Sequence, residues 1–322
     1  RRQRQMCIRD RTDLGNNIYR AQYTLQGTED NGLVPFTLNF VDQAGNTLSG
    51  NLTALVDDTD GGVTYDDEAP TLDRVTITSS NSNSATLAKV DDVITFSITA
   101  SEQIKAPQIV IAGRTGAGAA TLSDDTNTDG LQIYTATYTM KQDDPEGVVA
   151  FTVDFQDLAS NTGTQVIALT AEDLDGGVTF DKTPPFFNQT IGGEVGSVTI
   201  SSNNANGNTN LAKIGDQITL SFVATEVIKV GSNPTVVINN NNAVVGRVGD
   251  TDKIFTATYS MSAISDGNAE IDPVTFLISS YEDAAGNSGA DVNATTDGSA
   301  IKYDPVTPTL SNVACLLYTS PS

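Results

Sequence analysis

The feature that most constrains the fold of this 322-residue chain is an internal repeat. Three similar segments recur along the chain, and an Asp-x-Ala-(Gly or Ser)-Asn turn follows each. The segments are IYRAQYTL at 18–25, IYTATYTM at 133–140 and IFTATYSM at 254–261, and the turns occupy 42–46, 157–161 and 283–287. Because several motifs return in the same order, we interpret the chain as copies of one structural unit.

The front half of a unit recurs as well, since LAKVDD at 87–92 returns as LAKIGD at 211–216. The repeat therefore predicts two complete units, whereas the first copy matches the back half of a unit alone. The predicted divisions are an arm at 1–11, a truncated first unit at 12–72, complete units at 73–185 and 186–310, and a terminal stretch at 311–322.

Residues 1–11 and 315–322 match no part of the repeat, and the alternative for the stretch 311–322 is that it starts a next unit. Five of the 17 basic residues lie in the first stretch, and the two cysteines of the chain, Cys7 and Cys315, lie one in each. Both stretches resemble translated sequencing-adaptor read-through, so we leave them out of the fold prediction. A cationic, cysteine-bearing arm is the alternative interpretation.

Within each unit the hydrophobic period is two. Ile94, Phe96 and Ile98 alternate with Thr95 and Ser97, which is typical of a strand with one face on a core. Threonine favours strands over helices. Short alternating runs separated by Gly, Asn and Asp turns predict an all-β fold, with about seven strands per unit in an immunoglobulin-like β-sandwich.

Composition excludes several functions. The chain has no histidine, which removes Ser–His–Asp and Cys–His mechanisms. The pair Asp143-Asp144 has no identifiable partner carboxyl across a cleft, as a glycosidase requires. A net charge of −23 repels phosphates and anionic lipid headgroups, so we expect no nucleic acid partner and no membrane insertion. We expect a protein that is not an enzyme.

The order of motifs resembles the bacterial Ig-like repeat found in tandem in large surface and secreted proteins of the adhesin type. The motifs that carry the resemblance are LAKVDD and LAKIGD, the segments at 133–140 and 254–261, the three turns, and the linker that ends in Thr307-Pro308-Thr309-Leu310. The resemblance covers nearly all of residues 12–314 and implies a sandwich fold with a spacing or adhesive role. Ser160 and the pair Pro184-Pro185 depart from its pattern and leave the exact loop shapes open.

Acidic residues are the best functional candidates. In a sandwich of this topology, one strand ends before Glu102 and another before Asp157, at the pole where the chain enters. Converging carboxylates repel one another unless a cation neutralises them, and calcium prefers oxygen ligands. The candidate ligands are Asp66, Asp67, Glu68, Glu102, Asp157, Asp173 and Asp175 at the first junction, and Asp181, Glu226, Asp283 and Asp297 at the second.

The turn residues also have a purely structural interpretation. The side chains of Asp157 and Asn161 can bond to nearby backbone, which is ordinary turn chemistry. Lys89 and Lys213 begin matching strands, and we interpret them as surface lysines whose ammonium groups remain in solvent.

These inferences predict a non-catalytic stalk or spacer, extracellular or on a bacterial surface, with calcium stiffening the junctions. Its immediate partners would be neighbouring repeats, and any cell-surface or polysaccharide ligand would bind at other domains. The alternatives are an accessory module of a secreted polysaccharide-active enzyme, which exposed aromatic rows would favour, and a surface-layer protein.

Overall fold

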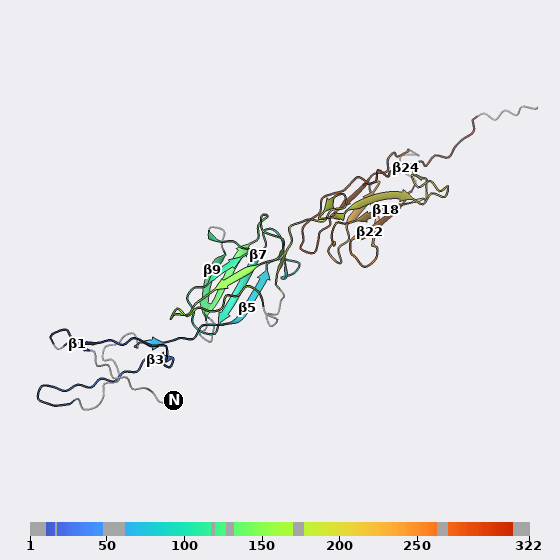
Figure 1. Cartoon of the computed structure of the whole chain (residues 1–322). Helices are drawn as coiled ribbons and strands as arrows, with labels where there is room; N and C mark the ends of the chain where they lie inside the picture. Colours follow the sequence, from blue (N-terminus) through green and yellow to red (C-terminus); the bar gives the residue numbers. More distant parts are fainter. Residues whose placement is uncertain are drawn as a thin grey trace, which may run out of the picture.

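The structure is a computed structural model, and it describes residues 11–16, 18–47, 62–116, 120–126, 132–169, 177–262 and 270–311. The named secondary-structure elements among these residues are all β-strands. The repeated segments form β10 (Gln132–Thr139) and β22 (Ile254–Ser260). Two groups of strands follow one another along an elongated molecule, and a smaller N-terminal group precedes them (Figure 1). We call them the central unit (β5–β13), the C-terminal unit (β14–β24) and the N-terminal segment (β1–β4).

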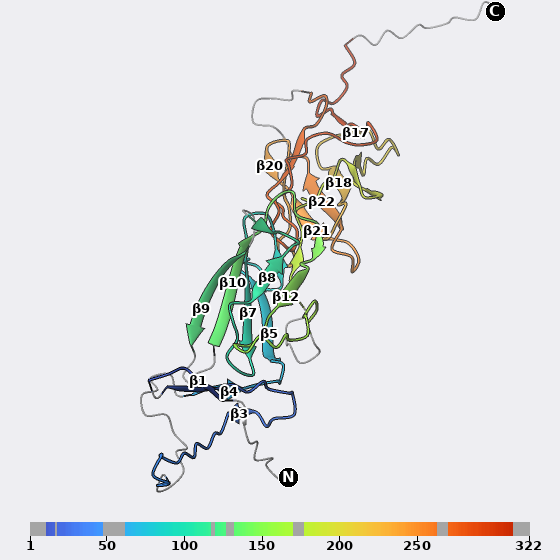
Figure 2. The ribbon, with the colours of Figure 1, turned by 60° about the vertical axis from the view of Figure 1, so that its left-hand side comes forward.

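The central unit contains two layers. One is an antiparallel sheet in the order β5–β7–β10–β9 (Figure 2). In the other, β6 pairs in parallel with β13, β13 pairs with β11, and β12 pairs with β8. The new strands are β5 (Leu72–Ser79), β6 (Leu87–Ala88), β7 (Val93–Ala100), β8 (Gln108–Ile111), β9 (Thr121–Thr126), β11 (Gly147–Val148), β12 (Phe151–Asp154) and β13 (Thr179–Phe180). With β5–β6 and β11–β12 counted as two interrupted strands, this is the seven-strand order of an immunoglobulin-like sandwich.

The alternation of the sequence explains which face of β7 meets the core. Ile94, Phe96 and Ile98 are at most 1% exposed, whereas Thr95 and Ser97 point to the outer face and are half-buried. Successive side chains of a strand point to opposite faces, so a shift of one residue would expose all three hydrophobic side chains.

The C-terminal unit repeats this plan. Its four-stranded sheet has the order β16–β18–β22–β21, and its other layer contains β17 paired with β24 and the sheet β20–β19–β23. An additional hairpin, β14–β15, precedes the first sheet. The strands are β14 (Thr190–Ile191), β15 (Glu194–Val195), β16 (Ser197–Ser202), β17 (Leu211–Ala212), β18 (Gln217–Val223), β19 (Thr235–Ile238), β20 (Asn241–Asn242), β21 (Val244–Arg247), β23 (Phe276–Ser279) and β24 (Lys302–Tyr303).

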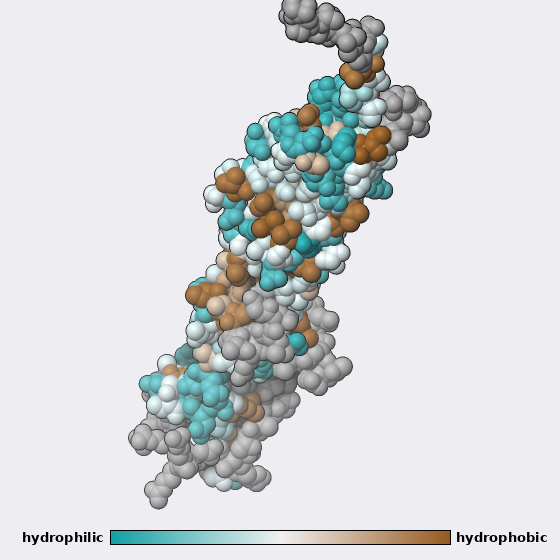
Figure 3. Space-filling view, turned by 90° about the vertical axis from the view of Figure 1, so that its right-hand side faces the viewer, coloured by the Kyte–Doolittle hydropathy of each residue, from teal (hydrophilic) through white to brown (hydrophobic). Residues whose placement is uncertain are grey.

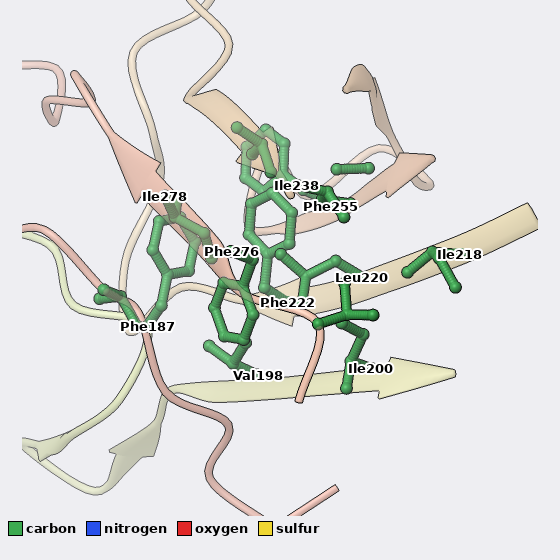
Figure 4. Close-up of a cluster of buried hydrophobic side chains, with 14 of the residues drawn as sticks. Phe187, Val198, Ile200, Ile218, Leu220, Phe222, Ile238, Phe255, Phe276 and Ile278 are labelled. Carbon is green, nitrogen blue, oxygen red and sulfur yellow. The ribbon is translucent and has the colours of Figure 1, made fainter. Parts of the chain in front are cut away.

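Each complete unit has its own hydrophobic core, and the two cores share no residue. The core of the C-terminal unit includes Phe187, which comes directly from the linker (Figure 4). The Phe187 ring packs edge-on against Phe222, with ring centroids 4.9 Å apart, and Phe222 stacks on Phe255 at 5.4 Å. The linker is therefore anchored in the unit that it enters.

The N-terminal segment has no comparable core among its described residues. Its strands are β1 (Arg11–Asp13), β2 (Tyr19–Ala21), β3 (Gly32–Leu33) and β4 (Thr64–Tyr65). Tyr19 is 58% exposed, whereas its repeat equivalent Tyr134 is 3% exposed. Phe36 is 39% exposed and its equivalent Phe151 is 7% exposed. The same sequence pattern is buried only where a second layer covers it.

Candidate metal centre at the unit junctions

The Asp-x-Ala-(Gly or Ser)-Asn turns share one local structure. Asp283 Oδ1 accepts hydrogen bonds from the backbone N–H of Gly286 and Asn287, and Asp283 Oδ2 accepts one from Asn287 Nδ2 at 2.8 Å. Asp157 and Asn161 make the corresponding bonds at 2.8 and 2.7 Å. The fourth turn residue has a positive φ in each case, +89° at Gly286 and +81° at Ser160. The replacement of glycine by serine therefore leaves the turn shape unchanged.

The turn carboxylate lies beside the end of a neighbouring strand. Glu102 follows β7 by two residues, and isolated bridge pairing between Ile104 and Asp157 brings that chain segment to the turn. In the C-terminal unit, Ile228 pairs with Asp283 in the same way and places Glu226 there. The sandwich topology thus brings together residues that are more than 50 positions apart in sequence.

The linker supplies a third carboxylate. Asn161 Nδ2 donates to the carbonyl oxygen of Asp66 at 3.0 Å, and Asn287 Nδ2 donates to that of Asp181, also at 3.0 Å. Carboxylate oxygens of three residues consequently lie within 4.8 Å of one another at each junction. The two groups, which we call the acidic triads, are Asp66, Glu102 and Asp157 at the first junction and Asp181, Glu226 and Asp283 at the second.

Within the second triad, Glu226 favours protonation in the absence of a cation. Burial, followed by the nearby charges of Asp181, Asp283 and Glu146, raises the pKa of Glu226 to about 8. Burial is also the main cause of a raised pKa at Asp181. At the first junction the pKa of Glu102 is raised in the same direction, by burial and then by Asp66, Asp157 and Glu68. A proton or a bound cation would relieve this repulsion.

Other predicted ligands lie outside the triads. Asp67 accepts a hydrogen bond from the Tyr65 hydroxyl at 3.3 Å, and Asp297 accepts one from the backbone N–H of Ser299 at 2.9 Å. Glu68 contributes charge near Glu102 without joining the triad. Asp173 and Asp175 fall outside the described residues.

Sequence analysis missed Glu146, whose charge raises the pKa of Glu226 and Asp181. Its carboxylate accepts a hydrogen bond from the Thr183 hydroxyl at 2.6 Å. It lies between β10 and β11, and no repeated motif includes it. The sequence therefore offered no signal for it.

Hydrogen bonds also join the central unit to the turn of the C-terminal unit. Asn81 Nδ2 donates to the carbonyl oxygen of Ala285 at 2.8 Å, and Lys89 Nζ donates to that of Gly286 at 3.1 Å. Asn83 Nδ2 donates to the carbonyl oxygen of Ala284 at 3.3 Å. Lys89 is therefore half-buried in a contact between units, and its interpretation as a solvent-directed surface lysine was wrong. The sequence feature that could have pointed to a specific role for Lys89 is the recurrence of the Leu-Ala-Lys motif in both complete units.

The Asp143-Asp144 pair belongs to a structural ion pair. The Asp144 side chain is 0% exposed and lies 2.6 Å from the Arg114 guanidinium. It also accepts hydrogen bonds from the Tyr138 hydroxyl at 2.8 Å and from the backbone N–H of Lys141 at 2.7 Å. Burial, then the hydrogen bond to Asp144, raises the pKa of Tyr138 to about 12. These contacts connect the Arg114 loop to the end of β10.

The fold and the triads define a tandem, all-β, immunoglobulin-like protein with acidic junctions. No protein-family model matches the chain, and no curated protein matches it. Two crystal structures are similar over much of the chain, Rst D1-D2 and bovine butyrophilin. Rst D1-D2 has 10% sequence identity and a TM-score of 0.31, and the match covers 74% of this chain and 100% of that one. Bovine butyrophilin has 11% sequence identity and a TM-score of 0.24, and the match covers 69% of this chain and 98% of that one. TM-scores this low do not support a fold assignment, so the assignment rests on the strand order.

In the part of the chain that the structure describes, no helix is long and apolar enough to cross a membrane.

Proposed function

We propose that this chain is a non-catalytic spacer segment of a bacterial surface or secreted protein of the adhesin type, with a calcium ion at each junction. The observation that carries the proposal is the recurrence of the acidic triad. The same three positions of the repeat supply carboxylates at both junctions, within 4.8 Å of one another. A solvated acidic surface gives no reason for the same convergence to occur twice.

The donor set suits calcium. All three ligands are carboxylates, and calcium takes six to eight oxygen ligands in flexible geometry. The turn bonds leave room for coordination, because Asp283 Oδ2 accepts one hydrogen bond and retains a lone pair. Three side chains alone leave several positions for water or backbone carbonyls. We therefore expect weak binding, with a dissociation constant of about 10⁻⁴–10⁻³ M as in extracellular calcium modules.

The spacer role is supported by how the complete units meet. They lie end to end (Figures 1 and 2), and four side-chain to main-chain hydrogen bonds described above connect them. Lys229 adds a bridge, since its ammonium group pairs with Glu282 at 2.6 Å and donates to Asn83 Oδ1 at 2.9 Å. Contacts of this kind limit bending between two independently packed cores. Neighbouring repeats are thus the proposed partners of each unit.

A carbohydrate-binding accessory module is the weaker candidate. Tyr134, Tyr138, Phe222 and Phe255 are all less than 5% exposed. Figure 3 shows separate hydrophobic patches on one face of the molecule, between hydrophilic residues. Among the described residues, the large aromatic side chains with high exposure belong to the N-terminal segment.

Calcium titration of the full chain tests the proposal. We expect thermal unfolding to shift upward in millimolar calcium relative to chelator, with magnesium producing a smaller shift. Small-angle scattering should show a more extended, less variable particle with calcium. The matched variants Glu102→Gln and Glu226→Gln should each remove part of the response. Equal melting temperatures with calcium and with chelator would exclude a stabilising calcium site at the junctions. A flexible particle in both conditions would exclude the spacer role.

A further inference from the structure

The contact between the two complete units uses a prepared surface on the central unit. Asn81 Nδ2 donates to Asp92 Oδ2 at 2.6 Å, and the backbone N–H of Lys89 donates to the same oxygen at 2.8 Å. The backbone N–H of Asn83 donates to Asn81 Oδ1 at 2.9 Å. This network holds the side chains of Asn81, Asn83 and Lys89 at the pole, where each reaches a carbonyl oxygen of the turn at 284–286.

The C-terminal unit contains the same network at its own far pole. Asn204 Nδ2 donates to Asp216 Oδ2 at 2.7 Å, and the backbone N–H of Lys213 donates to that oxygen at 2.9 Å. The backbone N–H of Asn206 donates to Asn204 Oδ1 at 3.1 Å. The anchor of the network, Asp216, is 7% exposed here, and its equivalent Asp92 is half-buried.

This pole also presents the acceptor that completes the contact. The backbone N–H of Asp304 donates to the carbonyl oxygen of Ala212 at 2.8 Å, as Asp181 does to Ala88. Asp304 thus occupies the place of Asp181, whose carbonyl oxygen receives Asn287 Nδ2 in the existing junction.

The two poles differ in exposure. Asn81 is 7% exposed and Lys89 is half-buried in the junction, whereas their equivalents Asn204 and Lys213 are half-buried and exposed; Asn83 and its equivalent Asn206 are both exposed. Two hydrophobic neighbours, Leu211 and Ile214, are 42% and 45% exposed.

We propose that the pole formed by Asn204, Asn206, Lys213 and the main chain of Asp304 is a docking surface for the Asp-x-Ala-Gly-Asn turn of another unit of this kind. The three side chains donate to the turn carbonyls, and the turn asparagine donates to the Asp304 carbonyl oxygen. The inference rests on the proposed spacer function, because it takes the partner to be a further repeat. The docking requires no cation, since each proposed contact is a hydrogen bond equivalent to one between the two existing units.

An extended chain tests the proposal. In this extended chain, residues 1–308 are joined to a second copy of residues 186–310. The Asp-x-Ala-Gly-Asn turn of the second copy is thereby held close to the pole of the first copy at high effective concentration. Cys7 is replaced by Ser, and spin labels are attached through cysteines at exposed positions. Labels at Thr121 and Val244 report the existing junction, and labels at Val244 and its copy report the new one by pulsed electron resonance distances.

We expect both distance distributions to be narrow. N206A with K213M should broaden the new distribution and leave the existing one unchanged, whereas N83A with K89M should do the reverse. Asn293→Ala, an exposed change away from the pole, should affect neither. A broad new distribution in the parent, or one unaltered by N206A with K213M, overturns the docking surface. A broad Thr121–Val244 distribution in the parent counts instead against the spacer function.

Discussion

The replacement Glu226→Gln examines the electrostatics of the second triad. Without a cation, three carboxylates within 4.8 Å of one another repel. Two unit charges at about this distance interact by roughly 3 kcal/mol near a protein surface. Burial, followed by the charges of Asp181, Asp283 and Glu146, raises the pKa of Glu226 from 4.5 to about 8. Glutamine keeps the size of the side chain, removes its charge and adds an N–H donor that can face the remaining carboxylates.

The direction of the pH dependence follows from linkage. Because the folded pKa of Glu226 is raised, its favourable contribution is complete below about pH 4.5 and is lost as the pH rises through about 8. The full difference between the two pKa values corresponds to at most about 5 kcal/mol. Glu226 is partly exposed, so solvent screening reduces the expected loss to about 2 kcal/mol.

Urea unfolding in chelator at pH 4 and pH 9 measures the effect. At pH 4 Glu226 is largely protonated in both the folded and the unfolded wild type, so the variant and the wild type should have similar free energies of unfolding. At pH 9 the variant should be more stable by about 2 kcal/mol. Calcium should reverse the order at pH 9, because it stabilises the wild type and has one ligand fewer in the variant. Glu102→Gln is the control from the first junction, where the same direction is expected.

A variant that is less stable than the wild type at pH 9 in chelator would refute the reasoning. Such a result would mean that the ionised Glu226 is favourably solvated or paired in the folded protein. An equal gain at pH 4 and pH 9 would attribute the change to packing instead of charge.

Three further substitutions test the structural account by urea unfolding. Ser160→Gly should stabilise the central unit by about 1 kcal/mol, because a non-glycine residue at positive φ is strained; an unchanged stability would contradict this. Arg114→Met should cost about 3 kcal/mol by leaving the Asp144 charge buried without its cation, and a loss below about 1 kcal/mol would show that Tyr138 suffices. Phe187→Ala should lower the free energy of unfolding of the C-terminal unit by about 3–5 kcal/mol, and a smaller loss would show that the linker is not anchored in that core.

The strand pattern was largely readable from local sequence. Alternation at 94–98 predicted a strand with one buried face, and the structure confirms it with Ile94, Phe96 and Ile98 in the core. The turn at 157–161 was equally local, because Asp157 and Asn161 bond to each other across four residues. Such features depend on neighbours in the chain, so the sequence contains the information for them.

The contact of Lys89 with Gly286 was not readable in this way. These residues are 197 positions apart, and they meet because two units pack pole to pole. Arg114 and Asp144 are 30 positions apart and meet because a loop folds over the end of a strand. Neither pair has a spacing that periodicity can reveal.

The sequence by itself determined that this protein is a series of all-β units, because hydrophobic alternation and turn chemistry act over a few residues and are replayed at each copy. Which acidic residues converge was decided by the tertiary structure. Of the candidates near the first junction, Asp66 joins Glu102 and Asp157, while Asp67 turns to Tyr65. The physical reason is that charge repulsion and coordination depend on distances of a few ångströms, and these are set where strand ends and linker meet at one pole.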